Sequence, residues 1–279
     1  MTDLLSIMWV PFLACLVLVG ILGYLGMHIL QRGVIFVDLA LAQFAALGST
    51  LAVLFDQDVH GALAFGWSLA FTFLGALIFS LTRLRHVDIP QEAFIGVAWA
   101  VASSAAIVAL HSAPHGAEHI EEMLVGSILW VPIADVAKAA AMYLSVGFLH
   151  WVFRHKFLRI SLDPDGATAA GMRVRWWDFL FYASFGFVVT SSVKIAGVLL
   201  VFCFLIVPSI VGALFARSVS GRLMIAWGFG WVVSMLGCVL SYTLDLPTGA
   251  AVVCTFGIAL VLVLVIRAPR LGRIGSGGG

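Results

Sequence analysis

Residues 196–216 read AGVLLVFCFLIVPSIVGALFA, a stretch of 21 residues without a charged side chain. An α-helix needs about 20 consecutive apolar residues to cross the hydrocarbon core of a bilayer. Similar runs recur along the whole chain, and the short segments between them carry most of the charges. We therefore predict an all-α, polytopic integral membrane protein with about nine transmembrane helices. The predicted spans lie at about residues 4–31, 34–55, 62–82, 93–111, 134–153, 176–193, 196–216, 222–243 and 249–266.

The composition of the chain excludes a water-soluble monomer. Of its 279 residues, 62% are hydrophobic and 10% are charged, and the mean hydropathy is +1.12. A formal net charge of +1 gives no basic field for a nucleic-acid backbone, so we expect no nucleic-acid partner. The loops are too short for a soluble domain, which predicts a single transmembrane domain over residues 1–274. The terminal GSGGG at 275–279 is expected to be a flexible tail or linker.

The cysteines give no sign of a disulfide framework. All four lie inside apolar runs and form no CxxC pair, so we expect small buried hydrophobic side chains rather than disulfides or a thiolate zinc site. They are Cys15, Cys203, Cys238 and Cys254.

The positions of the basic residues predict the orientation in the membrane. With nine spans, 13 of the 15 Lys and Arg residues fall on one side of the bilayer. Short cytoplasmic loops hold an excess of Lys and Arg, so this side is the cytoplasm. The N-terminus then faces outward and the C-terminus faces inward, and the outer side is acidic and rich in histidine.

A short helix is predicted between the fifth and sixth spans, in the sequence SLDPDGATAAGM. Asp163 and Pro164 are typical of a helix start, and Gly171 is typical of a helix end, which leaves about two turns of Ala-rich helix. Such a helix is too short to cross a membrane. On residue pattern alone it could also be a simple connector lying at the lipid surface.

The sequence pattern of this segment, DPxxAxAxG, resembles the cytoplasmic coupling segment of the metal-ion permeases of ABC transporters. These permeases form the zinc, manganese and iron uptake family. The residues that carry the resemblance are Asp163, Pro164, Ala167, Ala169 and Gly171. Two further stretches resemble the same family: GVLLVFCFLIVPSIVGA at 197–213 and GCVLSYTLDLPTGAA at 237–251. The resemblance covers nearly the whole chain in the expected order.

This resemblance implies the membrane-spanning permease subunit of a metal importer in the cytoplasmic (inner) membrane. It implies a homodimer, two copies of a separate ATPase that meets the coupling segment, and an extracytoplasmic metal-binding protein. The chain would then be no enzyme and would hold no permanent cofactor, with a zinc or manganese ion as its cargo. Indeed, the sequence contains no GxxxxGK[ST] phosphate loop. ATP-driven motion of the coupling helices would switch the dimer between outward-open and inward-open states.

Asp38 is the leading candidate for a residue on the metal path. A charge inside a span costs several kcal/mol unless it is paired, so intramembrane acids are functional candidates. On a helix, Ala42, Ala45 and Ser49 share the face of Asp38 and form a stripe suited to close packing. The alternative is structural: Asp38 caps its helix or pairs with Arg32.

The sequence departs from the family pattern after Asp38. In the family, an Asp in this helix is followed four residues later by a His, but Ala42 occupies that position here. Gln43 lies one residue further and points about 140° away from Asp38 on a regular helix. Either a π-bulge restores the shared face, or the path relies on Asp38 with neutral oxygens.

The outer segment offers a second candidate metal site. Glu118, His119 and Glu122 can share one helical face, and imidazole with carboxylates suits zinc or manganese at an entrance. The alternative is a solvated loop that docks a partner. We expect His28 and His150 to be interfacial, and Asp135 to neutralise Lys138 three residues later.

Two other functional classes remain. One is an ATP-independent secondary transporter or channel that uses Asp38 and Asp135, against which the coupling segment and the lack of inverted hydropathy repeats argue. The other is a membrane metalloprotease, which has no support because no HExxH motif occurs.

Overall fold

The computed structural model describes residues 2–55, 61–82, 89–110 and 128–271, and all regular structure within these ranges is helical. The helices are α1 (Thr2–Arg32), α2 (Val37–Leu54), α3 (Ala62–Leu81), α4 (Gln91–Leu110), the 3-10 turn η1 (Ile128–Trp130), α6 (Ile133–Val152), α7 (Arg154–Leu162), α8 (Pro164–Ala169), α9 (Val174–Phe215), α10 (Val219–Leu244) and α11 (Thr248–Leu271).

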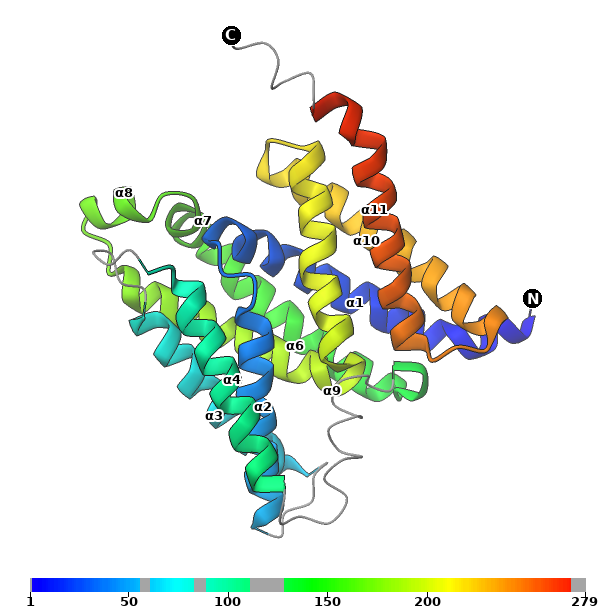
Figure 1. Ribbon diagram of the computed structural model, residues 1–279, viewed down its shortest axis with the longest axis horizontal. Helices are drawn as coiled ribbons and strands as arrows, with labels where there is room; N and C mark the ends of the chain where they lie inside the picture. Colours follow the sequence, from blue (N-terminus) through cyan, green and yellow to red (C-terminus); the bar gives the residue numbers. More distant parts are fainter. Residues whose placement is uncertain (1, 56–60, 83–88, 111–127, 272–279) are drawn as a thin grey trace.

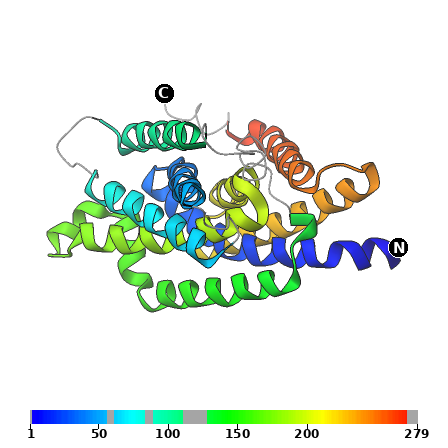
Figure 2. The same cartoon turned by 90° about the horizontal axis from the view of Figure 1, so that it is seen from below.

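The longest helix, α9, organises the packing. It contacts α1, α2, α3, α10 and α11, and its side chains form a large part of the buried core. Figure 2 shows α1 and α6 along one side of the molecule and α4 and α11 along the other, with α2 and the second half of α9 between them. The helices α2 and α9 therefore lie at the centre of the bundle.

A break at Gly197 divides α9 into two halves. Gly197 has φ 76° and ψ 161°, a backbone conformation essentially restricted to glycine because a Cβ atom would clash with the backbone. Figure 1 shows the helix changing direction within its length. The spans predicted at 176–193 and 196–216 fall on the two sides of this break.

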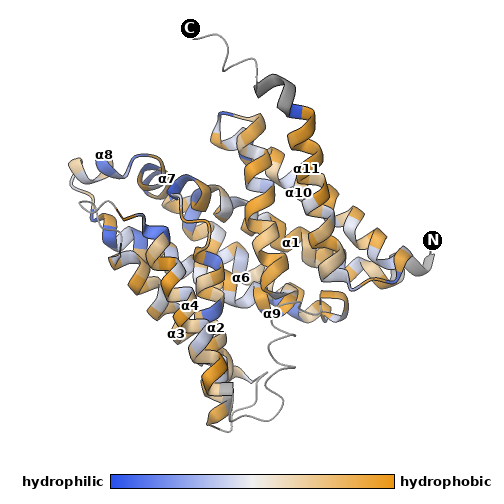
Figure 3. Cartoon of the chain, in the orientation of Figure 1, coloured by the Kyte–Doolittle hydropathy of each residue, from blue (hydrophilic) through white to orange (hydrophobic). Residues whose placement is uncertain are grey.

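Six described helices are long and apolar enough to cross a membrane: α1, α3, α4, α9, α10 and α11. A seventh candidate combines α6 and α7, which meet at 75°. The remaining predicted span falls on α2, whose 18 residues include a shorter apolar stretch. Hydrophilic residues gather at α7, α8 and several helix ends (Figure 3), whereas apolar residues dominate the long helices.

Glycines allow α1, α2 and α9 to approach their neighbours closely. A Cβ atom at Gly26 of α1 would collide with the backbone carbonyl of Leu205 in α9, and one at Gly48 of α2 would meet the carbonyl of Trp67 in α3. Ala42 and Ala45 are also buried, as the predicted stripe of small residues requires. Close helix approach through small residues is typical of membrane bundles.

Candidate functional site: buried polar groups and the coupling segment

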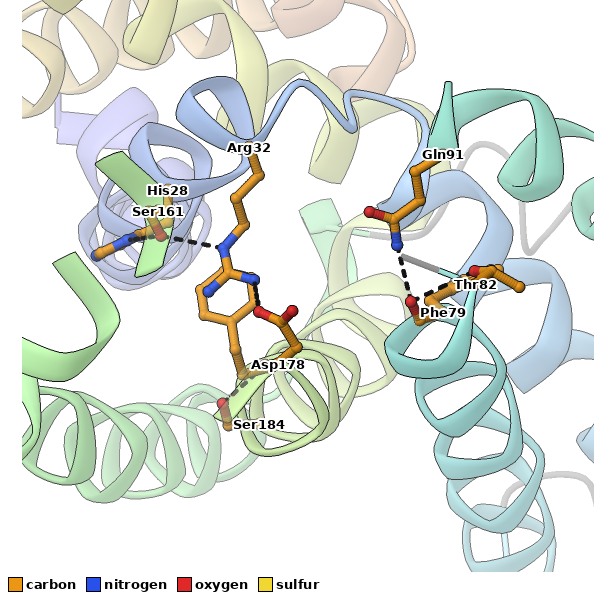
Figure 4. A network of polar contacts seen from close by, with 9 residues as sticks. His28, Arg32, Phe79, Thr82, Gln91, Ser161, Asp178 and Ser184 are labelled. Carbon is orange, nitrogen blue, oxygen red and sulfur yellow. Dashed lines mark hydrogen bonds and ion pairs between the residues drawn. The ribbon is translucent and has the colours of Figure 1, made fainter. Parts of the chain in front are cut away.

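A buried ion pair lies at one end of the bundle, where α1, α7 and α9 meet. Arg32 Nη1 is 2.6 Å from Asp178 Oδ1, and the two side chains are 1% and 0% exposed. Arg32 Nε donates to Ser161 Oγ at 3.0 Å, and the guanidinium lies 3.9 Å from the centre of the Phe181 ring. Figure 4 shows Arg32 reaching from α1 between Ser161 and Asp178. The pair neutralises a charge that would otherwise be costly in this apolar interior.

Two histidines extend this network. His28 Nδ1 is 3.0 Å from Ser161 Oγ, and His150 Nε2 is 2.8 Å from Ser184 Oγ. Their ring centres are 6.5 Å apart, and both residues are only 1% exposed. The prediction that His28 and His150 are interfacial was therefore wrong. Their position reflects tertiary packing among α1, α6, α7 and α9, which the local sequence does not encode.

Asp38 lies in the first turn of α2 and is 2% exposed. Its Oδ1 atom is buried and has no hydrogen-bond partner among the described residues. The alternative in which Asp38 pairs with Arg32 is wrong, because Arg32 binds Asp178 instead. An unsatisfied buried carboxylate oxygen costs folding free energy, so its presence calls for an explanation such as a functional role.

The structure also decides whether a π-bulge brings Gln43 onto the helix face of Asp38. The helix α2 is regular from residue 37 to residue 54, without a π-bulge. Gln43 is half-buried and lies about 140° around the helix from Asp38. Gln43 therefore cannot share a ligand face with Asp38 within one chain, and Ala42, at the family's His position, is packed in the core.

The coupling segment has the predicted local structure. The Asp163 carboxylate accepts a hydrogen bond from the Gly166 backbone N–H at 2.9 Å, and Pro164 is the first residue of α8. Gly171 has φ 75° and follows the end of the helix. Ala167 is fully buried against Ile160 and Val174, whereas Ala169 is exposed. Of these two alanines of α8, only Ala169 therefore has an exposed side chain.

The network and the coupling segment are directly connected. Ser161 belongs to the last turn of α7, two residues before Asp163, and it contacts both His28 and Arg32. The N-terminal end of α8 is therefore linked to α1 through the side-chain contacts of Ser161. Asp178 was not among the predicted site residues, although an acid inside the aromatic run WWDFLFY is a signal that could have identified it.

Several other predictions concern individual side chains. Lys138 Nζ lies 2.8 Å from Asp135 Oδ1, as predicted. Cys15 and Cys238 are buried, but Cys203 is only half-buried and Cys254 is exposed, contrary to the expectation. Within the described ranges, no group of three or more His, Cys, Asp and Glu residues is placed to hold a metal ion. Glu118, His119 and Glu122 lie outside the described residues.

A groove of about 1200 Å³ runs between α1, α6 and α10, and Arg154 and Leu158 of α7 also line it. Its lining is almost entirely aliphatic and aromatic and contains no carboxylate, imidazole or thiol group. Divalent transition metals need such groups as ligands. The groove is therefore unsuited to an ion path, and the central helices are the better candidates.

A comparison with protein families identifies the chain. The model of the ABC 3 transport family matches residues 5–267, nearly the whole sequence. The chain belongs to the ABC 3 transport family. As a member of this family it is a multi-pass membrane protein of the cytoplasmic membrane, in agreement with its apolar helices.

Relatives of this ABC 3 protein include two curated membrane proteins. The chain is 27% identical over 216 residues to an uncharacterised membrane protein of Synechocystis, covering 75% of the chain and 77% of that protein. It is 26% identical over 263 residues to the manganese transport system membrane protein MntC of Listeria innocua, covering 93% and 90%. A solved structure, PsaBC from Streptococcus pneumoniae in complex with Fab, has the same fold, with a TM-score of 0.78, 22% identity and 94% of each chain covered.

Proposed function

We propose that this protein is the permease subunit of an ATP-driven importer that moves a divalent transition-metal ion, zinc or manganese, by alternating access. Membership of the ABC 3 family and the similarity to a manganese transport protein support this proposal. The observation that carries it is Asp38, a buried acid with an unpartnered oxygen on a central helix. A negative charge there can offset part of the dehydration cost of a divalent ion.

The proposal includes nine spans, with the N-terminus outside and the C-terminus in the cytoplasm. A helix of 42 residues such as α9 would be about 60 Å long if straight, twice the hydrocarbon thickness. The Gly197 break instead allows its two halves to cross separately. With α2 and α6 included, this gives nine crossings and leaves 13 of the 15 basic residues on the cytoplasmic side.

The segment α7–α8 is proposed to receive the ATPase. The ATPase is a separate subunit, since this sequence contains no phosphate-binding loop. The exposed face of α8, with Ala169, offers a contact surface, and the adjoining loops extend it. Through Ser161, a displacement of α8 acts on Arg32 of α1, and through Arg32 on Asp178 of α9. Both helices pack in the bundle that contains Asp38.

Two copies of the chain are proposed to form the transport path between them, and an extracytoplasmic binding protein delivers the ion. Glu118, His119 and Glu122 are proposed to meet the ion at the entrance, because imidazole with carboxylates binds zinc and manganese. The ion then reaches Asp38 in the first turn of α2 and leaves toward the cytoplasm when the dimer opens inward.

The experiment that tests this function is metal uptake by Asp38→Asn. The substitution keeps the size of the side chain but removes its charge, so we expect uptake to fall strongly while the ATPase still co-purifies. Asp135→Asn serves as the matched control, because Asp135 is an exposed acid paired with Lys138 and should transport normally. Normal uptake by Asp38→Asn, or loss of assembly in place of loss of uptake, would place the ion path elsewhere.

A further inference from the structure

Three aromatic side chains in the wall of the groove between α1, α6 and α10 use their polar atoms within the chain. Trp227 Nε1 donates to the carbonyl of Gly20 at 2.9 Å, and Trp231 Nε1 donates to the carbonyl of Leu16 at 3.3 Å. The Tyr143 hydroxyl is hydrogen-bonded to serine hydroxyls of α9. These rings therefore present mainly carbon to an occupant of the groove.

A positive charge lies at one end of the groove. Among the described residues that line it, Arg154 alone is charged, and this exposed side chain forms no ion pair with a described acid. Ser220, in the first turn of α10, also lines the groove. Because Trp227 and Trp231 pair with α1 in antiparallel order, Ser220 lies toward the end of α1 that contacts α7. The N-terminal end of α10 carries a partial positive charge, which adds to that of Arg154.

The groove is open along its length. A Cβ atom added at Gly20 of α1 or at Gly147 of α6 would meet no described atom within 4 Å. The stretch of α10 that lines the groove, Val219 to Trp231, is about 18 Å long at the helical rise. One leaflet contributes about 15 Å of hydrocarbon to a bilayer. A lipid acyl chain therefore fits lengthwise, with its headgroup at the charged end.

The position of the groove favours lipid over a second copy of the chain. Figure 2 shows α1 and α6 along one side of the molecule and α4 and α11 along the other. The helix α2, which carries Asp38, packs mainly against α3, α4 and α9. Two copies that enclose an ion path at α2 would therefore meet away from the groove, which leaves its side of the bundle to the bilayer.

We propose that this groove binds one anionic phospholipid, with an acyl chain along α1 and α10 and the phosphate group at Arg154. The phosphate supplies the negative charge that Arg154 and the start of α10 attract, and the acyl chain covers the apolar walls. The bound lipid links α7, the helix before α8, to α1, α6 and α10. The site is tested by binding alone, so its failure would leave the proposed transport function unaffected.

The first test titrates the purified full chain in detergent with phosphatidylglycerol, or with zwitterionic phosphatidylcholine of the same acyl chains, and counts bound lipids by native mass spectrometry. We expect the first phosphatidylglycerol to bind about fivefold more tightly, the gain from one cation near a lipid surface. Arg154→Gln removes the charge and should abolish this preference. The matched control is Lys156→Gln, because Lys156 is also exposed on α7 but lies outside the groove lining. Equal affinities in the native chain, or an unchanged preference in Arg154→Gln, would overturn the proposal.

A second variant blocks the groove itself. Gly147→Leu fills space that no described atom occupies, so it should fold normally and weaken both lipids by about tenfold or more, the equivalent of about two lost methylene contacts. Gly228→Leu is its control, since this glycine of α10 has equally open space but lies outside the groove lining. Undiminished lipid binding by Gly147→Leu would refute the site. A changed oligomeric state with unchanged lipid binding would also refute it, and would make a second copy the occupant.

A third test locates the lipid and separates it from free phosphate. In vesicles that hold the complete transporter, phosphatidylglycerol with a photoreactive acyl chain should label α1, α6 and α10 at the groove more strongly than α4 or α11. Gly147→Leu should lower the groove labelling selectively. Even labelling of all exposed helices would contradict the proposal, and so would displacement of the lipid by inorganic phosphate alone.

Discussion

Replacing Asp178 by alanine leaves the Arg32 guanidinium buried without its carboxylate. In the native protein the two groups are 2.6 Å apart and 1% or less exposed. Removing one partner of a buried pair typically costs about 3–5 kcal/mol, because the remaining charge is uncompensated. Arg32 keeps its bond to Ser161 and its position over Phe181, and a desolvated cation–π contact retains about 2 kcal/mol. We therefore expect a loss at the lower end of this range, about 3 kcal/mol.

The assay measures the free energy of unfolding in detergent for Asp178→Ala, and for a double-mutant cycle of Arg32→Met, Asp178→Leu and the combined variant. Replacing both partners by apolar residues removes the unpaired charge, so the combined variant should recover most of the loss. The control is Asp135→Ala, whose ion pair has a similar length of 2.8 Å but is 48–77% exposed and should cost about 1 kcal/mol or less. Additive losses in the cycle, or an Asp178→Ala cost no larger than that of Asp135→Ala, would refute the reasoning.

Two further predictions concern close packing and the coupling helix. Gly26→Ala should destabilise the protein by about 1–3 kcal/mol, because the new methyl group meets the Leu205 carbonyl, whereas Gly20→Ala has open space and should be neutral or stabilising in the same thermal-unfolding assay. Ala169→Glu should prevent co-purification of the ATPase with unchanged permease stability, whereas Ala167→Glu should lower stability because that site is buried. Retention of the ATPase by Ala169→Glu would remove α8 from the proposed interface.

The helical architecture follows closely from the sequence because hydropathy over about 20 residues is a local property. Each predicted span coincides with a described helix or with one half of α9, and the start and end of α8 were predicted from Asp163, Pro164 and Gly171. These residues act through their own backbone geometry and their nearest neighbours, and local sequence is sufficient for that.

The interior polar network could not be predicted in the same way. Arg32 and Asp178 are 146 residues apart, and no periodicity within either helix indicates that they meet. Histidines near helix ends resemble interfacial residues in sequence, so the burial of His28 emerges only from the packing of α7 against α1. Asp38 was singled out as a candidate because an acid in an apolar run is conspicuous in the sequence.

The 75° turn between α6 and α7 makes α7 a short lever arm at one end of the bundle. A single residue, Phe153, separates the two helices, and its φ of −98° and ψ of 16° lie outside the helical pattern. The nine residues of α7 form an arm of about 13 Å, so each ångström of travel at its far end turns the arm by about 4°. That far end carries Ser161, whose hydroxyl group is hydrogen-bonded to His28 and Arg32 of α1. A displacement of α7 at this end would therefore pass through Ser161 to Arg32 of α1, and through the Arg32–Asp178 pair to α9.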